Sequence, residues 1–184
     1  TCNWWGISTF AGVQSKISGN AHYVPYLTSG TDDQTGTAGF QPASGTCTGY
    51  PIHINGTGYA SLQDAINNTT PGQIIAIATG IYYGGLDASS FSVIVSPGAS
   101  PGCPTINGDY VLTNDDSMAM EVNGTTACTD YDQLTVIGGV TLGGAKLNLS
   151  LGYTPSKGDI IKLIDNDGSD AVSGTFEQGA SITV

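Results

Sequence analysis

The sequence predicts an all-β protein folded as a parallel β-solenoid (a β-helix), with one short capping helix near residues 61–68. Two observations lead to this prediction. Short apolar or alternating segments recur between residues 73 and 165, and Gly, Asn or Asp residues that favour turns separate them. One amphipathic helical pattern precedes all of these segments.

The helix is expected in the stretch YASLQDAINNTTPG. Ser61 is a suitable N-cap, and Asp64 follows it three residues later, as in a capping box. Leu62, Ala65 and Ile66 form an apolar stripe at helical spacing, and a Pro-Gly pair ends the pattern. Because a helix this short is not stable alone, we expect it to cover the open end of the first strands.

The strands are clearest in AKLNLSL, residues 145–151, where four apolar side chains alternate with polar ones. These apolar residues are Ala145, Leu147, Leu149 and Leu151. The Gly pairs 138–139 and 143–144 bracket the three-residue strand VTL, a length that suits the corners of a solenoid. Alternation alone does not distinguish parallel from antiparallel pairing, so a β-sandwich is the alternative for the C-terminal unit.

Differences in composition and residue pattern divide the chain into three parts. Residues 1–27 contain CNWWG, which resembles the final coil of a β-helix in secreted surface proteins, so this segment is expected to be terminal-coil-like. Its adjacent tryptophans would point to opposite faces of a strand. Residues 28–49 are rich in Gly, Thr and Ser and are expected to form a linker or long loop, with Phe40 and Cys47 as anchors. Residues 50–184 form the predicted β-solenoid unit.

Composition restricts the partners and the compartment. The chain has 184 residues, a formal net charge of −11 and four basic side chains, all of them lysine. This charge disfavours nucleic acid and anionic membranes as partners. No apolar run approaches the ~18 residues that span a bilayer, so membrane insertion is not expected. With 10% charged residues, surface polarity must come mainly from Thr, Ser, Asn and Gly, as is common in extracellular β-rich proteins.

The four cysteines indicate disulfides in an oxidising compartment. They show no C-x-x-C spacing and no nearby His at ligand spacing, which argues against zinc. We favour the pairs Cys103–Cys128 and Cys2–Cys47, because each closes a loop within one segment. A bridge between subunits through Cys2 is the alternative.

Several motifs resemble known secreted proteins. The stretch from Gly58 to Tyr83 is similar to the opening of bacterial right-handed parallel β-helix domains. SPGASPG, INGDY, YDQL, GGVTLGGAKL, IDNDG and GTF together resemble the stem module of autotransporter-type adhesins. This resemblance implies an extracellular structural or adhesive protein without a catalytic site. The sequence departs from the resemblance at Cys103 and Cys128, where such modules usually carry ordinary turn residues.

The residues give little indication of enzymatic chemistry, and we predict no catalytic residue and no cofactor. Most Asp residues lie in turn contexts, where the side chain caps its own turn. His22 and His53 lie in different segments without an obvious nucleophile beside them. Calcium is a weaker interpretation of DNDGSD, which offers Asp165, Asp167 and Asp170, because the order of residues differs from that of an EF-hand loop.

The predicted function is that of an extracellular structural subunit of a self-assembling surface filament or adhesin stalk. Copies would join head to tail through unfinished β ends, because such a contact does not close on itself. The expected contact residues are Trp4, Trp5, Ile7, Ile182 and Val184. The alternative is a carbohydrate-binding or carbohydrate-active β-helix protein that recognises surface glycans. Its sugar-stacking platform would be formed by aromatic residues, namely Tyr50, Tyr59, Tyr82, Tyr83, Tyr110 and Trp4 or Trp5. A third interpretation is a fragment of a larger adhesin.

Overall fold

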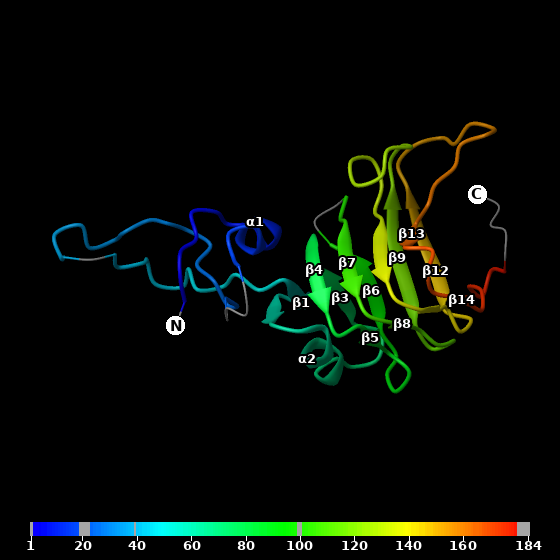
Figure 1. Cartoon of the computed structure of the whole chain (residues 1–184), viewed down its shortest axis with the longest axis horizontal. Helices are drawn as coiled ribbons and strands as arrows, with labels where there is room; N and C mark the ends of the chain where they lie inside the picture. The colour runs from blue at the N-terminus through cyan, green and yellow to red at the C-terminus, as the bar shows by residue number, and fades with distance from the viewer. Residues whose placement is uncertain (1, 19–22, 39, 99–100, 180–184) are drawn as a thin grey trace.

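The computed structural model describes residues 2–18, 23–38, 40–98 and 101–179, and Figure 1 shows the arrangement of its elements. Two short helices, α1 and α2, occupy Phe10–Gln14 and Leu62–Asn67. The first seven strands are β1 Ile52–Ile54, β2 Thr57–Tyr59, β3 Ile74–Ile77, β4 Gly80–Tyr83, β5 Leu86–Asp87, β6 Ile94–Pro97 and β7 Pro104–Asn107. The others are β8 Tyr110–Val111, β9 Ser117–Val122, β10 Leu134–Ile137, β11 Val140–Thr141, β12 Lys146–Leu151, β13 Ile164–Asn166 and β14 Val172–Ser173.

The strands form three sheets. The six-stranded sheet has the order β12-β9-β6-β3-β1-β2, and two four-stranded sheets have the orders β13-β10-β7-β4 and β14-β11-β8-β5. From β3 onward every third strand along the chain joins the same sheet, and these pairs are parallel. The outermost strands at one end of the molecule are therefore β12, β13 and β14 (Figure 1).

The predicted fold class, an all-β parallel β-solenoid with a single helix, is wrong. The structure is a mixed arrangement with two helices, and its largest sheet is mixed because β1 pairs antiparallel with both β2 and β3. The reason is local. Asn55 and Gly56 both adopt positive φ, 49° and 81°, which folds the chain into a tight hairpin between β1 and β2. The β-sandwich alternative is also wrong, because the sheets number three and the C-terminal pairs are parallel.

The helix expected near residues 61–68 is present as α2, and the Ser61 hydroxyl accepts a hydrogen bond from the Asp64 amide at 3.1 Å. Helix α1 was not expected. Thr9 caps it by accepting from the Gly12 amide at 3.3 Å, and Phe10 and Val13 are buried.

The core consists of apolar columns, in which residues at matching positions of successive strands stack inside the sheets. One column runs through the six-stranded sheet as Ile75, Val95, Met118 and Leu147. Leu86, Tyr110, Val140 and Val172 form a column in the sheet of β5, β8, β11 and β14. The inner members of both columns are at most 2% exposed. Burial of such side chains stabilises the fold by about 1.5–3 kcal/mol each.

A glycine corner joins the two four-stranded sheets. Gly108 and Gly138 have φ of 145° and 147°, and Gly138 lies over Gly108. A Cβ at Gly138 would lie 2.6 Å from the carbonyl carbon and oxygen of Gly108, so a side chain cannot fit without moving backbone.

Two buried carboxylates fasten the loops between strands. Asp116 accepts from the amides of Val93 at 3.0 Å and Thr113 at 2.7 Å. Asp132 accepts from the amides of Gly102 at 2.6 Å and Glu121 at 2.7 Å. Both residues are 1% exposed, so these charge-assisted hydrogen bonds take the place of the ones that water would make to an exposed carboxylate.

The described residues of 2–18, 23–38 and 40–49 lie mainly beyond the first strands, at the end of the molecule away from β12, β13 and β14 (Figure 1). The Leu27 amide donates to the Asn3 carbonyl at 3.0 Å, and Tyr26 and Gly49 exchange two backbone hydrogen bonds. Helix α1 links this part to the sheets, because Phe10 packs on Tyr82 with 5.3 Å between ring centroids. No helix of the described residues is long and apolar enough to cross a membrane.

Candidate functional site

The outer edge of β12 is the candidate site, and its backbone directions follow from the pairing with β9. The Lys146 backbone amide donates to the Asp116 backbone carbonyl, and the Gly152 amide donates to the Val122 carbonyl, both at 2.9 Å. Because backbone groups alternate along a strand, the N–H and C=O groups of Leu147, Leu149 and Leu151 point away from β9.

Residues 177 and 178 cover the beginning of this edge. The Glu177 amide donates to the Ala145 carbonyl at 2.9 Å. The Gln178 side-chain amide then takes the place of a strand residue: it accepts from the Leu147 amide at 3.2 Å and donates to the Leu147 carbonyl at 3.0 Å. Lys146 and Glu177 add an exposed ion pair at 3.7 Å. Beyond Gln178, the outward groups of Leu149 and Leu151 have no hydrogen-bond partner among the described residues.

An apolar groove lies beside this uncovered part of the edge. It has a volume of about 260 Å³, and most of its lining is aliphatic. The lining includes Val122, Leu147, Leu149, Leu151, Tyr153, Ile161 and Leu163. Exposure increases along the strand, from 7% at Leu147 to 40% at Leu151, although both side chains belong to the inward face. The groove is therefore the place where the core of the six-stranded sheet reaches solvent.

The groove is also lined by Tyr153, which carries a polar hydroxyl group. The Tyr153 hydroxyl is buried and has no hydrogen-bond partner among the residues the structure describes. Burial, and then the negative charge of Asp159, raise the pKa of Tyr153. A buried hydroxyl without a partner is costly, so this position favours an additional polar neighbour.

The column of the sheet ending in β14 is uncovered in the same way. Val172 is the last member of its apolar column and is 57% exposed, whereas Val140 directly beneath it is 1% exposed. The half-buried Leu149 and the exposed Leu151 and Val172 are together called the tail surface below.

The first strands, in contrast, are covered. The hairpin of β1 and β2 pairs with β3, α2 packs against β1 and β5, and α1 packs against β4. Among the described residues the two ends of the stacked strands therefore differ. The chain itself closes one end, and at the other end apolar side chains and backbone groups have no cover from the described part of the chain.

The predicted contact residues of the N-terminal segment lie in different places. Trp4 and Trp5 line a hollow of about 590 Å³ together with Leu27, Phe40 and Pro42, called the head hollow below. Ile7 is not part of the hollow and packs against the core. Phe40 was expected to anchor its loop, but it is 45% exposed. Ile182 and Val184 lie outside the described residues.

Two disulfides join Cys2 to Cys47 and Cys103 to Cys128, which are the pairs favoured from the sequence. Their Cα atoms are 5.9 and 5.4 Å apart, within the usual range for such bridges. The expectation of disulfides is confirmed, and they are compatible with a secreted protein.

The weaker calcium interpretation placed three Asp residues in one loop, and the structure gives these side chains other partners. Asp167 accepts from the Ser169 amide and hydroxyl at 3.0 and 2.7 Å, and Asp165 pairs with Lys162 at 3.0 Å. The Asp170 carboxylate accepts from the Ser169 hydroxyl at 3.3 Å. Across the described part of the chain, no three His, Cys, Asp or Glu side chains lie together as a metal site would require.

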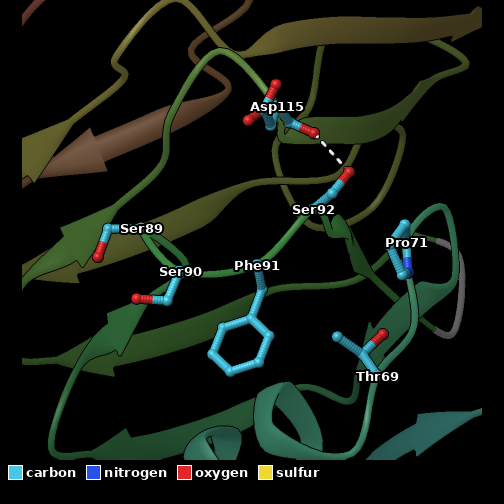
Figure 2. Close-up of a pocket in the computed structure, with 7 residues that line it drawn as sticks. All are labelled: Thr69, Pro71, Ser89, Ser90, Phe91, Ser92 and Asp115. Atoms are coloured by element: carbon cyan, nitrogen blue, oxygen red, sulfur yellow. Dashed lines mark hydrogen bonds between the residues drawn. The ribbon is translucent and has the colours of Figure 1, made fainter.

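A second hollow, of about 380 Å³, lies between the end of α2 and the loop before β6. Figure 2 shows its lining residues, Thr69, Pro71, Ser89, Ser90, Phe91, Ser92 and Asp115. The Ser92 hydroxyl donates to the Asp115 carbonyl at 2.8 Å, which fixes one wall. Asp115 is the only carboxylate that lines this hollow, whereas glycoside hydrolysis usually requires two.

The aromatic residues proposed for sugar stacking do not form one platform. Tyr82 and Tyr110 are buried in the core, at 5% and 0% exposure, and burial raises the pKa of both. Tyr83 is 74% exposed and points outward from β4. Trp4 and Trp5 belong to the head hollow.

Sequence reasoning missed Gln14, Gln178, Phe91 and the groove beside β12. The alternation in residues 145–151 did indicate which face of β12 is apolar. No sequence signal marks the two glutamines, because each acts on a strand far away along the chain. Comparison with protein-family models, curated proteins and solved structures found no match, so the site is interpreted from its own geometry.

Proposed function

We propose that this chain is an extracellular structural subunit of a surface filament or adhesin stalk, and that copies of it join head to tail. The tail surface is the observation that supports this proposal most. It leaves the ends of the core columns exposed at β12 and β14, and apolar surface of this kind marks contact sites.

The head hollow is the second contact in this proposal. Trp4, Trp5 and Phe40 supply large rings around a concave surface, and aromatic side chains are enriched at interfaces. The N-terminal part of the chain, which carries these residues, lies at the opposite end of the molecule from β12 and β14 (Figure 1). Two different surfaces at opposite ends fit a heterologous contact, which propagates into a filament when it does not close.

The test is analytical ultracentrifugation over a range of protein concentrations, followed by electron microscopy of the largest species. We expect association to increase with concentration and with added salt, because copies with a net charge of −11 repel one another. Phe40→Lys at the head and Val172→Lys at the tail should each abolish association. Ile137→Lys is the matched control, because Ile137 is 41% exposed on β10, within its sheet. A protein that stays monomeric at high concentration and high salt would contradict the proposal.

A non-enzymatic role is part of the same proposal. Asp116 and Asp132, the buried carboxylates, are already occupied by backbone amides, which supports a structural role for them. The hollow in Figure 2 favours carbohydrate binding as a second candidate function, because it combines the Phe91 ring with four hydroxyl-bearing residues and the Asp115 carboxylate. A glycan array with Phe91→Ala as the control distinguishes the two candidates.

A further inference from the structure

The loop between β12 and β13 carries the most exposed large apolar side chain among the described residues. Ile160 is 84% exposed, whereas its neighbour Ile161 lines the groove beside β12, so the two side chains point in different directions. Figure 1 shows this loop, coloured orange, projecting from the end of the molecule that carries β12 and β13. A single exposed aliphatic residue is ordinary on a protein surface, so the shape and charge around Ile160 decide whether it marks a contact.

A turn closes the tip of this loop just before Ile160. The Asp159 amide donates to the Ser156 carbonyl at 3.0 Å, and the Asp159 carboxylate accepts from the Ser156 amide at 2.8 Å. Gly158 has a φ of 106°, a backbone conformation that other residues rarely adopt. Because the turn is already formed, the loop loses little conformational freedom when it binds. Residues 156–160 are called the knob below.

Lys157 gives the knob a positive charge that is available to a partner. Lys146 and Lys162 are already in ion pairs, but Lys157 forms none with the described residues. The chain has a net charge of −11 and only four lysines, so few of its groups can attract a second copy electrostatically. An exposed Ile beside an unpaired Lys fits a surface that is apolar at its centre and acidic at its rim.

The head hollow has this character. Its aromatic and aliphatic lining is fixed in part by the Trp4 indole, which packs so closely on Gly30 that no side chain would fit there. None of its lining residues is basic. Asp32 lies at the rim, because it pairs in an antiparallel bridge with Pro42, which lines the hollow. One oxygen of the Asp32 carboxylate accepts from two backbone amides of its own loop, and the other has no hydrogen bond to the described residues.

We propose that the knob of one copy inserts Ile160 into the head hollow of the next copy, with Lys157 facing Asp32. This assignment rests on the head-to-tail association proposed above, and it names the side chains that make the contact. Leu149 and Leu151 of the tail surface line a groove, and a groove does not fill a hollow, whereas Ile160 projects.

The partner is a second copy for two reasons. The N-terminal part of the chain, which carries the hollow, lies at the opposite end of the molecule from β12 and β13, which the loop of the knob connects (Figure 1). The knob therefore does not reach the hollow of its own chain. The β1–β2 hairpin of the next copy also covers its β3, which favours a contact between side chains over the addition of strands.

Cross-linking between two single-cysteine variants tests this contact directly. Ile160→Cys and Phe40→Cys are purified separately, mixed and mildly oxidised. We expect a covalent dimer that joins position 160 to position 40, identified by peptide mapping that also verifies the native disulfides. Ile137→Cys replaces Ile160→Cys in the matched control, because Ile137 is 41% exposed on β10, within its sheet. Equal yields from the two mixtures, or no bridge in the first, would overturn the proposal.

Analytical ultracentrifugation of surface variants separates this inference from the proposed filament. Ile160→Asp should raise the Kd of self-association at least about tenfold, and Ile160→Leu should leave it nearly unchanged. Lys157→Glu should also weaken association, more strongly at low salt than at high salt, because ions screen the new repulsion from Asp32. Association that persists unchanged in Ile160→Asp would overturn the role of the knob and leave head-to-tail joining intact. An unmodified chain that stays monomeric at every concentration would overturn both.

Discussion

The side chain of Gln14 makes a two-point hydrogen bond to the backbone of Ile81, the second residue of β4. Its amide nitrogen donates to the Ile81 carbonyl at 2.7 Å, and its oxygen accepts from the Ile81 amide at 2.8 Å. Gln178 makes the same pair of bonds to Leu147 on β12. One glutamine therefore substitutes for a neighbouring strand at each end of the stacked strands, and each satisfies backbone groups that would otherwise lie open at a sheet edge.

We predict that Gln14→Ala destabilises the protein by about 1–2 kcal/mol, because the Ile81 amide and carbonyl both lose their partner. The free energy of unfolding in urea is the measurement. Gln34→Ala is the control, since Gln34 is an exposed loop residue. Equal effects of the two substitutions would show that the Gln14 contact contributes nothing.

Asp116→Asn should lower the free energy of unfolding by about 1–3 kcal/mol. An amide in place of the carboxylate removes the charge that strengthens three hydrogen bonds, and its NH₂ group would face a backbone donor. Asp115→Asn is a close control, because the neighbouring side chain is exposed and should change stability by less than about 0.5 kcal/mol. Thermal unfolding of both variants distinguishes the buried contact from a general effect of charge.

Gly138→Ala is expected to destabilise the corner between the two four-stranded sheets by about 1–3 kcal/mol. The cost has two sources, the φ of 147° and the contact between the new methyl group and the Gly108 carbonyl. At Gly139, a Cβ would approach the Asp109 carboxylate only to 3.5 Å, an ordinary contact. Gly139→Ala should therefore unfold at nearly the same denaturant concentration as the unmodified protein, and a similar loss in both variants would contradict the argument.

The Asp130 loop should show a pH dependence with a definite sign. Hydrogen bonds from the Thr126 side chain and backbone lower the pKa of Asp130 below 3.8. A lowered pKa means that this contact stabilises the loop above pH 3.8, and that the contribution is lost as the pH falls through the folded-state value. NMR titration of the Asp130 carboxyl is the measurement. Thr126→Ala removes the side-chain hydrogen bond and should raise the pKa of Asp130 toward 3.8, and an unchanged midpoint would show that the Thr126 hydroxyl is not a cause.

The sequence predicts local features well where one element contains its own signal. The Ser61 cap and the apolar stripe of α2 lie within one turn of each other, and the alternation in residues 145–151 lies within one strand. Both are confirmed. Helix α1 has only five residues and a single Thr9 cap, too little to give a helical period. The Asn55–Gly56 pair is of a type that favours tight turns, but its consequence, an antiparallel hairpin that makes the sheet mixed, depends on which strands pair.

The candidate site was less predictable because it depends on contacts between distant residues. Gln14 lies 67 residues before Ile81, and Gln178 lies 31 residues after Leu147. Nothing near either glutamine indicates that its amide replaces a strand. The exposure of Leu151 and Val172 likewise depends on which strand comes last in each sheet, which is a property of the topology and not of the local pattern.

The two disulfides also determine how the chain would respond to mechanical tension. The two bridges close separate loops, with sequence separations of 45 and 25 residues, so the enclosed residues cannot be pulled straight while the bridges remain intact. A force applied along the chain would pass through the sulfur atoms and bypass both loops. Reduction would release this hidden length, up to about 3.5 Å for each residue. The oxidation state of the cysteines would therefore determine how far one molecule can be stretched before the tension in the chain rises.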